Sequence, residues 1–203
     1  MNMNMSETQF LESLKIFEGY AEHMYLDSKG YVTIGIGIML PTATAATNSG
    51  LSFINRKTRS PALPADISAD FVSVSQKAPK KLWPPSMYAQ YTSLLATTTS
   101  LATVFSKRLE GAKKDARVFF PAFDKLPPSA QWALVDMSFN LGLPKLNQFL
   151  KLKAALTAAL TTRDWKAVAA ESHRNGIQPD RNKAIHDWFL NAEPPPGPTK
   201  VIP

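Results

Sequence analysis

The chain has 203 residues, of which 44% are hydrophobic and 10% aromatic, a composition typical of a folded globular protein. A formal net charge of +7 favours anionic partners such as nucleic acid, an anionic membrane surface or an acidic polysaccharide. Cysteine is absent, which excludes disulfides, thiol catalysis and cysteine-ligated metal. Neither a signal-peptide pattern nor an apolar run of about 18 residues is present, so we expect a chain made in the cytoplasm without an integral membrane segment.

The first predicted element is a helix over residues 7–18. Ser6 and Gln9 form the pattern of a capping box, in which each side chain satisfies a backbone N–H at the start of a helix. Apolar residues then recur at helical spacing. Gly19 is placed to end the helix, because glycine readily adopts the left-handed conformation that follows a helix C-terminus.

A small hairpin is predicted next, within about 20–40. The tetrapeptide Asp27-Ser28-Lys29-Gly30 has aspartate first and glycine last, as turns often do, and lies between the β-rich segments MYL and YVTIGIGI. Residues 41–86 are punctuated by proline, serine, threonine and glycine. We therefore expect a loop-rich insertion there, with a helix near 67–75.

The segment 87–193 is predicted to be a helical lobe. Apolar spacing from Leu94 to Leu109 predicts one helix, and Phe119 begins a short element. Further helices are predicted over about 129–142, 144–161, 164–172 and 179–191. Residues 194–203 are a proline-rich tail, expected to be extended. The order of elements predicts a single α+β domain over 1–193, predominantly helical.

Three polar residues stand in the first elements: Glu18 at the helix end, Asp27 in the turn and Thr33 in the strand. Each has a structural explanation alone, as a solvated helix end, a turn former and a strand residue. Together they suit glycoside hydrolysis, which needs an acid to protonate the leaving oxygen and a second carboxylate to activate water or stabilise positive charge. The predicted roles are general acid for Glu18, and water positioning or charge stabilisation for Asp27 with Thr33.

The motifs Glu-Gly, Tyr-x-Asp and Gly-x-x-Thr-Ile-Gly-x-Gly, between Glu18 and Gly37, resemble the N-terminal signature of the phage-type lysozymes. The helix–hairpin active site of that family carries a Glu–Asp–Thr triad. Two later blocks are also similar: ALVDMSFNLG to the family's buried central helix, and ESHRNGIQPDRNKA to its distal helix pair. The resemblance implies a lysozyme-like fold in which the hairpin forms one cleft wall. It also implies a muramidase, an inverting glycoside hydrolase that cleaves the β-1,4 bond between N-acetylmuramic acid and N-acetylglucosamine in peptidoglycan.

The resemblance implies roles for two further residues. Arg181 stands where the family places an arginine against the catalytic glutamate, and would orient and tune it; the alternative is a surface arginine in a first helical turn. Asn140 matches a cleft position that can hydrogen-bond the sugar, and the alternative is a cap before Gly142. Ile38 replaces a histidine common in the family, but that histidine is better explained as an ion-pair member than as a catalyst.

The insertion bears on the biological role. Its stretch SGLSFINRKTRSPALPADISADFVSV is similar to an insert of lysozyme-like toxin domains, including pesticin-like bacteriocins and type VI secretion effectors, which short phage endolysins usually lack. The resemblance favours an antibacterial effector acting in the periplasm or cell wall of a target bacterium, with a phage endolysin as the alternative. Peptidoglycan glycan strands would be the substrate, and a toxin would need a cognate immunity protein. Nothing demands more than a monomer.

Two other classes of function stay open. Basic clusters at Lys77, Lys80 and Lys81 and within 108–117 are compatible with nucleic-acid binding, but no recognised nucleic-acid fold or aromatic platform accompanies them. A solvated face is the simpler explanation, so we expect no nucleic-acid partner. A non-catalytic wall-binding module is the second class, although binding alone has no need of the triad. The three histidines are scattered, so no metal site and no cofactor are expected.

Overall fold

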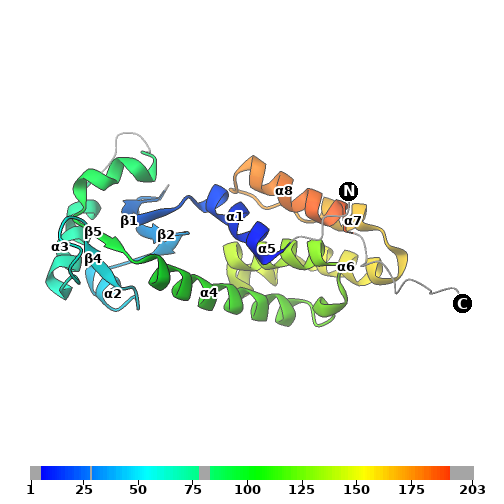
Figure 1. The fold of residues 1–203 in the computed structure, drawn as a ribbon. Coiled ribbons are helices and arrows are strands. Elements are labelled where there is room, and N and C mark those ends of the chain that lie inside the picture. Colours follow the sequence, from blue (N-terminus) through cyan, green and yellow to red (C-terminus); the bar gives the residue numbers. More distant parts are fainter. Residues whose placement is uncertain (1–5, 28, 78–82, 193–203) are drawn as a thin grey trace, which may run out of the picture. The chain divides into compact units, whose positions relative to one another are not determined.

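The computed structural model describes residues 6–27, 29–77 and 83–192. Within these ranges the protein is mostly helical and carries two small antiparallel sheets (Figure 1). This confirms the predicted α+β class, while the lysozyme-like fold stays a prediction. The predicted proline-rich tail lies outside the described residues.

The chain divides into two compact units. A sheet unit is the continuous segment Glu12–Lys107, and a helical unit combines the residues up to Leu11 with those from Arg108 onward. The boundaries fall inside two helices, α1 (Glu7–Glu18) and α4 (Thr98–Phe119). The predicted single domain over 1–193 stays a prediction.

Helix α1 begins and ends as its sequence predicts. The Ser6 N–H donates to Oε1 of Gln9 at 2.8 Å, and the Gln9 N–H donates to the Ser6 hydroxyl at 3.3 Å, which confirms the capping box. After Glu18 the chain leaves the helix at Gly19, whose φ of 74° is the left-handed conformation expected there.

The predicted hairpin is present and gains a third strand. Strands β1 (Ala21–Leu26), β2 (Val32–Gly35) and β3 (Ile38–Met39) form an antiparallel sheet in that order. The Asp27 carbonyl accepts from the Gly30 N–H at 3.0 Å, and the Asp27 N–H donates to the Tyr31 carbonyl at 2.9 Å, which closes the turn between β1 and β2.

The insertion is more regular than predicted. It holds helix α2 (Ala43–Thr47), strand β4 (Phe53–Asn55), helix α3 (Pro64–Ser75) and a 3-10 helix, η1 (Pro85–Tyr91). Strand β4 pairs with β5 (Leu94–Ala96), so the prediction that Leu94 begins a helix was wrong. The helix expected near 67–75 is confirmed as part of α3.

The insertion is ordered by contacts that local composition does not reveal. Phe53, Ile67, Val74 and Tyr88 are buried in one apolar cluster with the residues of the three-stranded sheet. Because strand pairing and burial come from residues far apart in sequence, they outweigh the loop-forming tendency of the intervening proline, serine and threonine.

The helical unit contains the C-terminal part of α4 and four later α-helices within the described residues: α5 (Pro128–Leu146), α6 (Leu150–Thr162), α7 (Trp165–Ala170) and α8 (Pro179–Leu190). The predicted short element near Phe119 is the end of α4 followed by a 3-10 turn at Phe123–Lys125. Gly142, predicted to end a helix, breaks α5 with φ 69° and ψ 160°. A further short helical segment follows it, so α6 begins later than predicted.

The N-terminal residues of α1 complete the core of the helical unit. Phe10 is fully buried. Its ring stacks on Trp132 of α5 with 4.5 Å between centroids, and lies 6.2 Å from the ring of Trp188 of α8. Aromatic pairs in this distance range stabilise a core beyond their buried area.

Candidate active site

Glu18 is the last residue of α1 and is half-buried. Its side chain lies against Gly37, in the turn between β2 and β3: a methyl group added to Gly37 would stand 3.2 Å from Oε2 of Glu18 and 3.5 Å from its carboxyl carbon. The fold therefore brings the helix end and the Gly-x-Gly turn together, as the hairpin prediction requires.

Asp27 follows β1 and is half-buried. Its Oδ1 accepts from the backbone N–H groups of Lys29, at 2.8 Å, and Tyr31, at 2.9 Å. Two donors on one oxygen fix the orientation of the carboxylate. Oδ2 accepts no hydrogen bond from the described part of the chain, so it is the oxygen available for chemistry.

Thr33 lies in β2, only 2% exposed, and is paired with Tyr25 of β1 and Met39 of β3. Residues directly opposite in an antiparallel pair place their side chains on the same face of the sheet. The Thr33 hydroxyl donates to the Tyr31 carbonyl at 3.2 Å, and its oxygen can still accept a hydrogen bond.

Tyr25 connects these residues. Its hydroxyl donates to the Glu18 carbonyl at 3.4 Å and accepts from the Gly37 N–H. Burial raises the pKa of Tyr25 to about 12, in the same direction as the negative charges of Glu18 and Asp27 and against a smaller opposing effect of the Gly37 N–H. The negative charges of both carboxylates thus disfavour ionisation of the same buried phenol. The sequence analysis included Tyr25 only as part of the Tyr-x-Asp motif and gave it no role. The strand register, which pairs Tyr25 with Thr33, is known only from the structure.

This raised pKa predicts an alkaline loss of stability. Because the folded state holds the Tyr25 proton more tightly than an unfolded chain, whose tyrosines titrate near 10, stability should be full below about pH 10 and fall as pH rises toward 12. Denaturant unfolding of wild type and Tyr25→Phe between pH 9 and 11.5 checks this. The wild type should lose stability more steeply; parallel curves would contradict the assignment.

Gly37 offers a sharper test of the contact with Glu18. Its φ is 63°, and Gly30 in the β1–β2 turn has φ 82° with open space where a Cβ would stand. Alanine at either position costs about 1–2 kcal/mol of backbone strain. Only Gly37→Ala also presses on the Glu18 carboxyl group.

If the protein is the muramidase that the resemblance implies, Gly37→Ala should lose activity well beyond Gly30→Ala at similar loss of stability. Unfolding free energies and initial rates on peptidoglycan, measured for both variants, check this. Equal activities of the two variants would show that the Glu18 contact does not matter.

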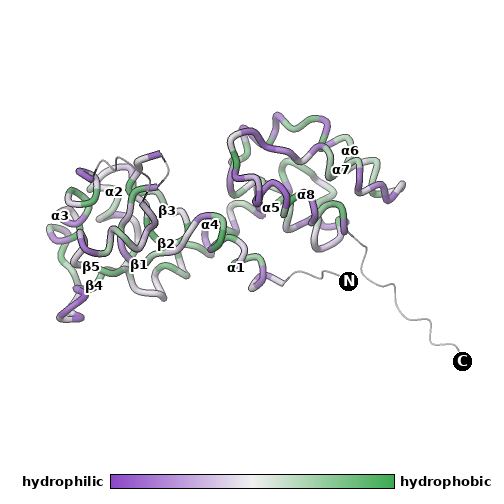
Figure 2. The backbone as a smooth tube through the Cα atoms, turned by 90° about the horizontal axis from the view of Figure 1, so that it is seen from above, coloured by the Kyte–Doolittle hydropathy of each residue, from purple (hydrophilic) through white to green (hydrophobic). Residues whose placement is uncertain are grey.

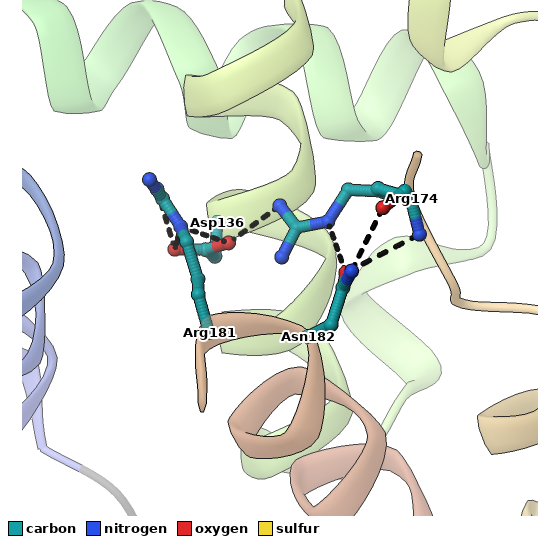
Figure 3. Close-up of polar contacts among 4 residues, drawn as sticks. All are labelled: Asp136, Arg174, Arg181 and Asn182. Atoms are coloured by element: carbon teal, nitrogen blue, oxygen red, sulfur yellow. Dashed lines mark hydrogen bonds and ion pairs between the residues drawn. The ribbon is translucent and has the colours of Figure 1, made fainter. Parts of the chain in front are cut away.

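A buried carboxylate organises the helical unit (Figure 3). Asp136 of α5 is fully buried and receives two arginines that are each 1% exposed. Nη1 of Arg174 lies 2.8 Å from Oδ1, and Nη2 of Arg181 lies 2.9 Å from Oδ2. Asn182 accepts from the N–H and Nε of Arg174 and donates to its carbonyl, which fixes that arginine in turn.

Arg181 is therefore buried, which excludes the alternative of a surface arginine in a first helical turn. It is buried at the start of α8 and held by Asp136, and its action on Glu18 stays a prediction. Sequence analysis missed Asp136 and Arg174. Asp136 has a signal, because a single acid in the apolar run ALVDMSF requires cations if the helix is buried.

Asn140 lies on α5, and its amide Oδ1 is buried with no hydrogen-bond partner in the residues described. The amide oxygen therefore does not cap the helix at Gly142. A buried acceptor without a donor is rare in proteins and suits a ligand that brings a donor. Its role in binding sugar stays a prediction.

Two cations of the basic cluster within 108–117 form ion pairs with acidic side chains of the protein. Lys113 contacts Glu7 and Glu110 at 3.0 and 2.9 Å, and Arg117 contacts Asp124 at 3.0 Å. These pairs favour a solvated face over a nucleic-acid surface. Lys80 and Lys81 of the first cluster lie outside the described residues.

No group of three histidine, aspartate or glutamate side chains in the described ranges is arranged to hold a metal ion, and no helix there is long and apolar enough to cross a membrane. Comparison of the sequence with protein-family models and with curated proteins found no match. The lysozyme resemblance therefore rests on the quoted motifs.

Proposed function

We propose that the protein is a muramidase that hydrolyses the β-1,4 bond between N-acetylmuramic acid and N-acetylglucosamine in peptidoglycan. The observation that carries this proposal is that the Glu18 carboxyl group packs against the Gly37 turn, while the charges of Glu18 and Asp27 both raise the pKa of the buried Tyr25 phenol. Two carboxylates in different surroundings are what glycoside hydrolysis needs.

The geometry supports a division of labour between the carboxylates. Glu18, half-buried against Gly37, would protonate the glycosidic oxygen. Asp27, with Oδ1 fixed by two N–H donors, would present Oδ2 to a water or to the positive charge at the anomeric carbon. Thr33 would help to position that water, and inversion of the anomeric centre is the expected outcome.

The resemblance also implies roles for two residues of the helical unit. Asn140 offers a buried amide oxygen, which fits the N–H of an acetamido group. Arg181, fixed by Asp136, would orient Glu18. The net charge of +7 would bring the protein to an anionic cell wall. The toxin-like insertion favours an antibacterial effector over a phage endolysin.

Digestion of purified peptidoglycan, with mass spectrometry of the released fragments, tests the activity. Fragments ending in reducing N-acetylmuramic acid are expected. Fragments ending in reducing N-acetylglucosamine, or no fragments at all, would refute the proposal. Nuclear magnetic resonance of the first-formed anomer reports inversion or retention.

A further inference from the structure

The sheet unit contains a pocket, which we call the insertion pocket. It has a volume of about 640 Å³ and lies among the turn after β4, one face of α3 and the end of η1. Figure 2 shows the turn after β4 as hydrophilic. The pocket is lined by Arg56, Lys57, Asp70 and Tyr91, among others. None of these residues belongs to the proposed catalytic group.

Arg56 has unused hydrogen-bonding capacity in this pocket. Its Nη2 donates to the Thr92 hydroxyl at 3.1 Å. Its Nε is buried and has no acceptor in the described part of the chain. Buried donors without acceptors are rare, and a pocket-lining side chain that carries one suits a ligand that brings an oxygen. The planar guanidinium matches a carboxylate, which accepts two parallel N–H bonds.

The charge of the lining favours a singly charged anion. Asp70 is the acidic residue of the lining, and its carboxylate already accepts from the Ser93 N–H and hydroxyl and from the Leu94 N–H at 2.9–3.1 Å. Two cations, Arg56 and Lys57, line the same pocket, so the lining has one more positive than negative charge. One negative charge neutralises the excess, whereas a doubly charged phosphate would leave the pocket with excess negative charge.

One wall of the pocket is aromatic and rigid. The Tyr91 ring stacks on Trp83 with 6.1 Å between centroids and 13° between planes, and Nζ of Lys77 lies 4.6 Å from the Tyr91 ring centroid. The Ser73 hydroxyl donates to the Tyr91 carbonyl at 2.8 Å. A fixed aromatic wall beside a cation suits the apolar part of a peptide that carries a carboxylate.

The insertion pocket is electrostatically coupled to the hairpin. His23 of β1 contacts the Pro85 carbonyl at 2.9 Å. Burial lowers the pKa of His23, and the positive charge of Arg56 lowers it further, while the Pro85 carbonyl and Glu22 act in the opposite direction. His23 therefore senses the charge of Arg56.

We propose that the insertion pocket binds a carboxylate through Arg56, and, resting on the proposed function, that this carboxylate belongs to the peptide stems of the cell wall. The glycan strand would then be engaged by the Glu18 site while a stem peptide occupies the insertion. Such a second contact would select wall that still carries its peptides over bare glycan.

The test follows the imidazole resonances of the three histidines in the full chain during titration with a synthetic stem peptide. Binding should shift His23 and raise its pKa, because the carboxylate neutralises Arg56, and leave His173 and His186 in the helical unit unchanged. The same peptide with amidated carboxylates should not bind. No shift, or binding of inorganic phosphate as tight as that of the peptide, would overturn the carboxylate site. Equal binding of acetate would overturn its assignment to the wall stems.

Arg56→Gln should weaken peptide binding at least about tenfold, the low end for a lost charge-assisted hydrogen bond. Arg59→Gln is the matched control, since it removes the same charge from an exposed arginine in the same turn that does not line the pocket. Arg56→Lys keeps the charge but not the planar fork and should also weaken binding, which covers the case in which Arg56→Gln does not fold. Equal affinities of the Arg56 and Arg59 variants would refute the assignment.

The proposal can fail separately from the muramidase. Glycan cleavage is measured on peptide-free glycan strands, and peptide binding is measured with no glycan present. Loss of the first result removes the proposed function, and loss of the second removes the insertion site.

Discussion

In the proposed muramidase, replacing Glu18 with glutamine should lower the rate of peptidoglycan hydrolysis by at least about 10²-fold, the low end for general acid catalysis. The amide keeps the shape that packs against Gly37 but cannot donate the acid proton. Rates of release of reducing sugar, with circular dichroism to verify the fold, provide the measurement.

Glu12→Gln is the matched control for this loss. Glu12 lies on the same helix, is exposed and contacts Lys15 at 2.8 Å, so the same substitution changes the same charge without touching the hairpin. It should leave the rate within about twofold, because Glu12 is none of the proposed catalytic groups and the loss of an exposed pair costs only about 0–1 kcal/mol of stability. If both variants stay active, Glu18 has no part in the reaction; if both lose activity, the charge of α1 matters rather than the acid.

The second large effect is structural. Asp136→Asn should destabilise the helical unit by about 3–5 kcal/mol, because the substitution leaves Arg174 and Arg181 buried without their shared carboxylate. That is a large fraction of the 5–15 kcal/mol typical of a folded protein. Three of the four tryptophans lie in this unit, at 132, 165 and 188, so tryptophan fluorescence during denaturant unfolding reports on it.

Asp124→Asn is the control for that measurement. Asp124 contacts Arg117 in a surface pair whose side chains are 70% and 48% exposed, so its loss should cost no more than about 1 kcal/mol. A cost for Asp136→Asn as small as that for Asp124→Asn would mean that the buried arginines are stabilised without it.

The parts of the fold that sequence analysis predicts well are those with local signals. The capping box and Gly19 delimit α1, the Asp27–Gly30 turn fixes the hairpin, and α8 spans Pro179–Leu190 against a prediction of 179–191. In each case the residues that decide the element lie within it or beside it.

The parts that escaped prediction depend on distant residues. β4 and β5 are about forty residues apart, and neither strand is long enough to show an alternating pattern. Because of this pairing Leu94 lies in a strand, although its apolar spacing predicted a helix. Helix α6 begins at Leu150 because the chain continues through a second segment after Gly142.

The candidate site divides in the same way. Sequence spacing was enough to select Glu18, Asp27 and Thr33, and the hairpin places all three in one compact unit. Tyr25 and Asp136 were missed because their importance lies in what packs around them. A tyrosine in a strand and an acid in a helix are ordinary residues until register and burial identify their partners.

The division of α1 between the two units has a consequence for synthesis. Phe10 belongs to the helical unit, yet its partners Trp132 and Trp188 are made after the whole of Glu12–Lys107. On a ribosome, the sheet unit is therefore complete while this phenylalanine still has no place to pack. The helical unit closes last, when Trp132 and Trp188 become available to pack against Phe10.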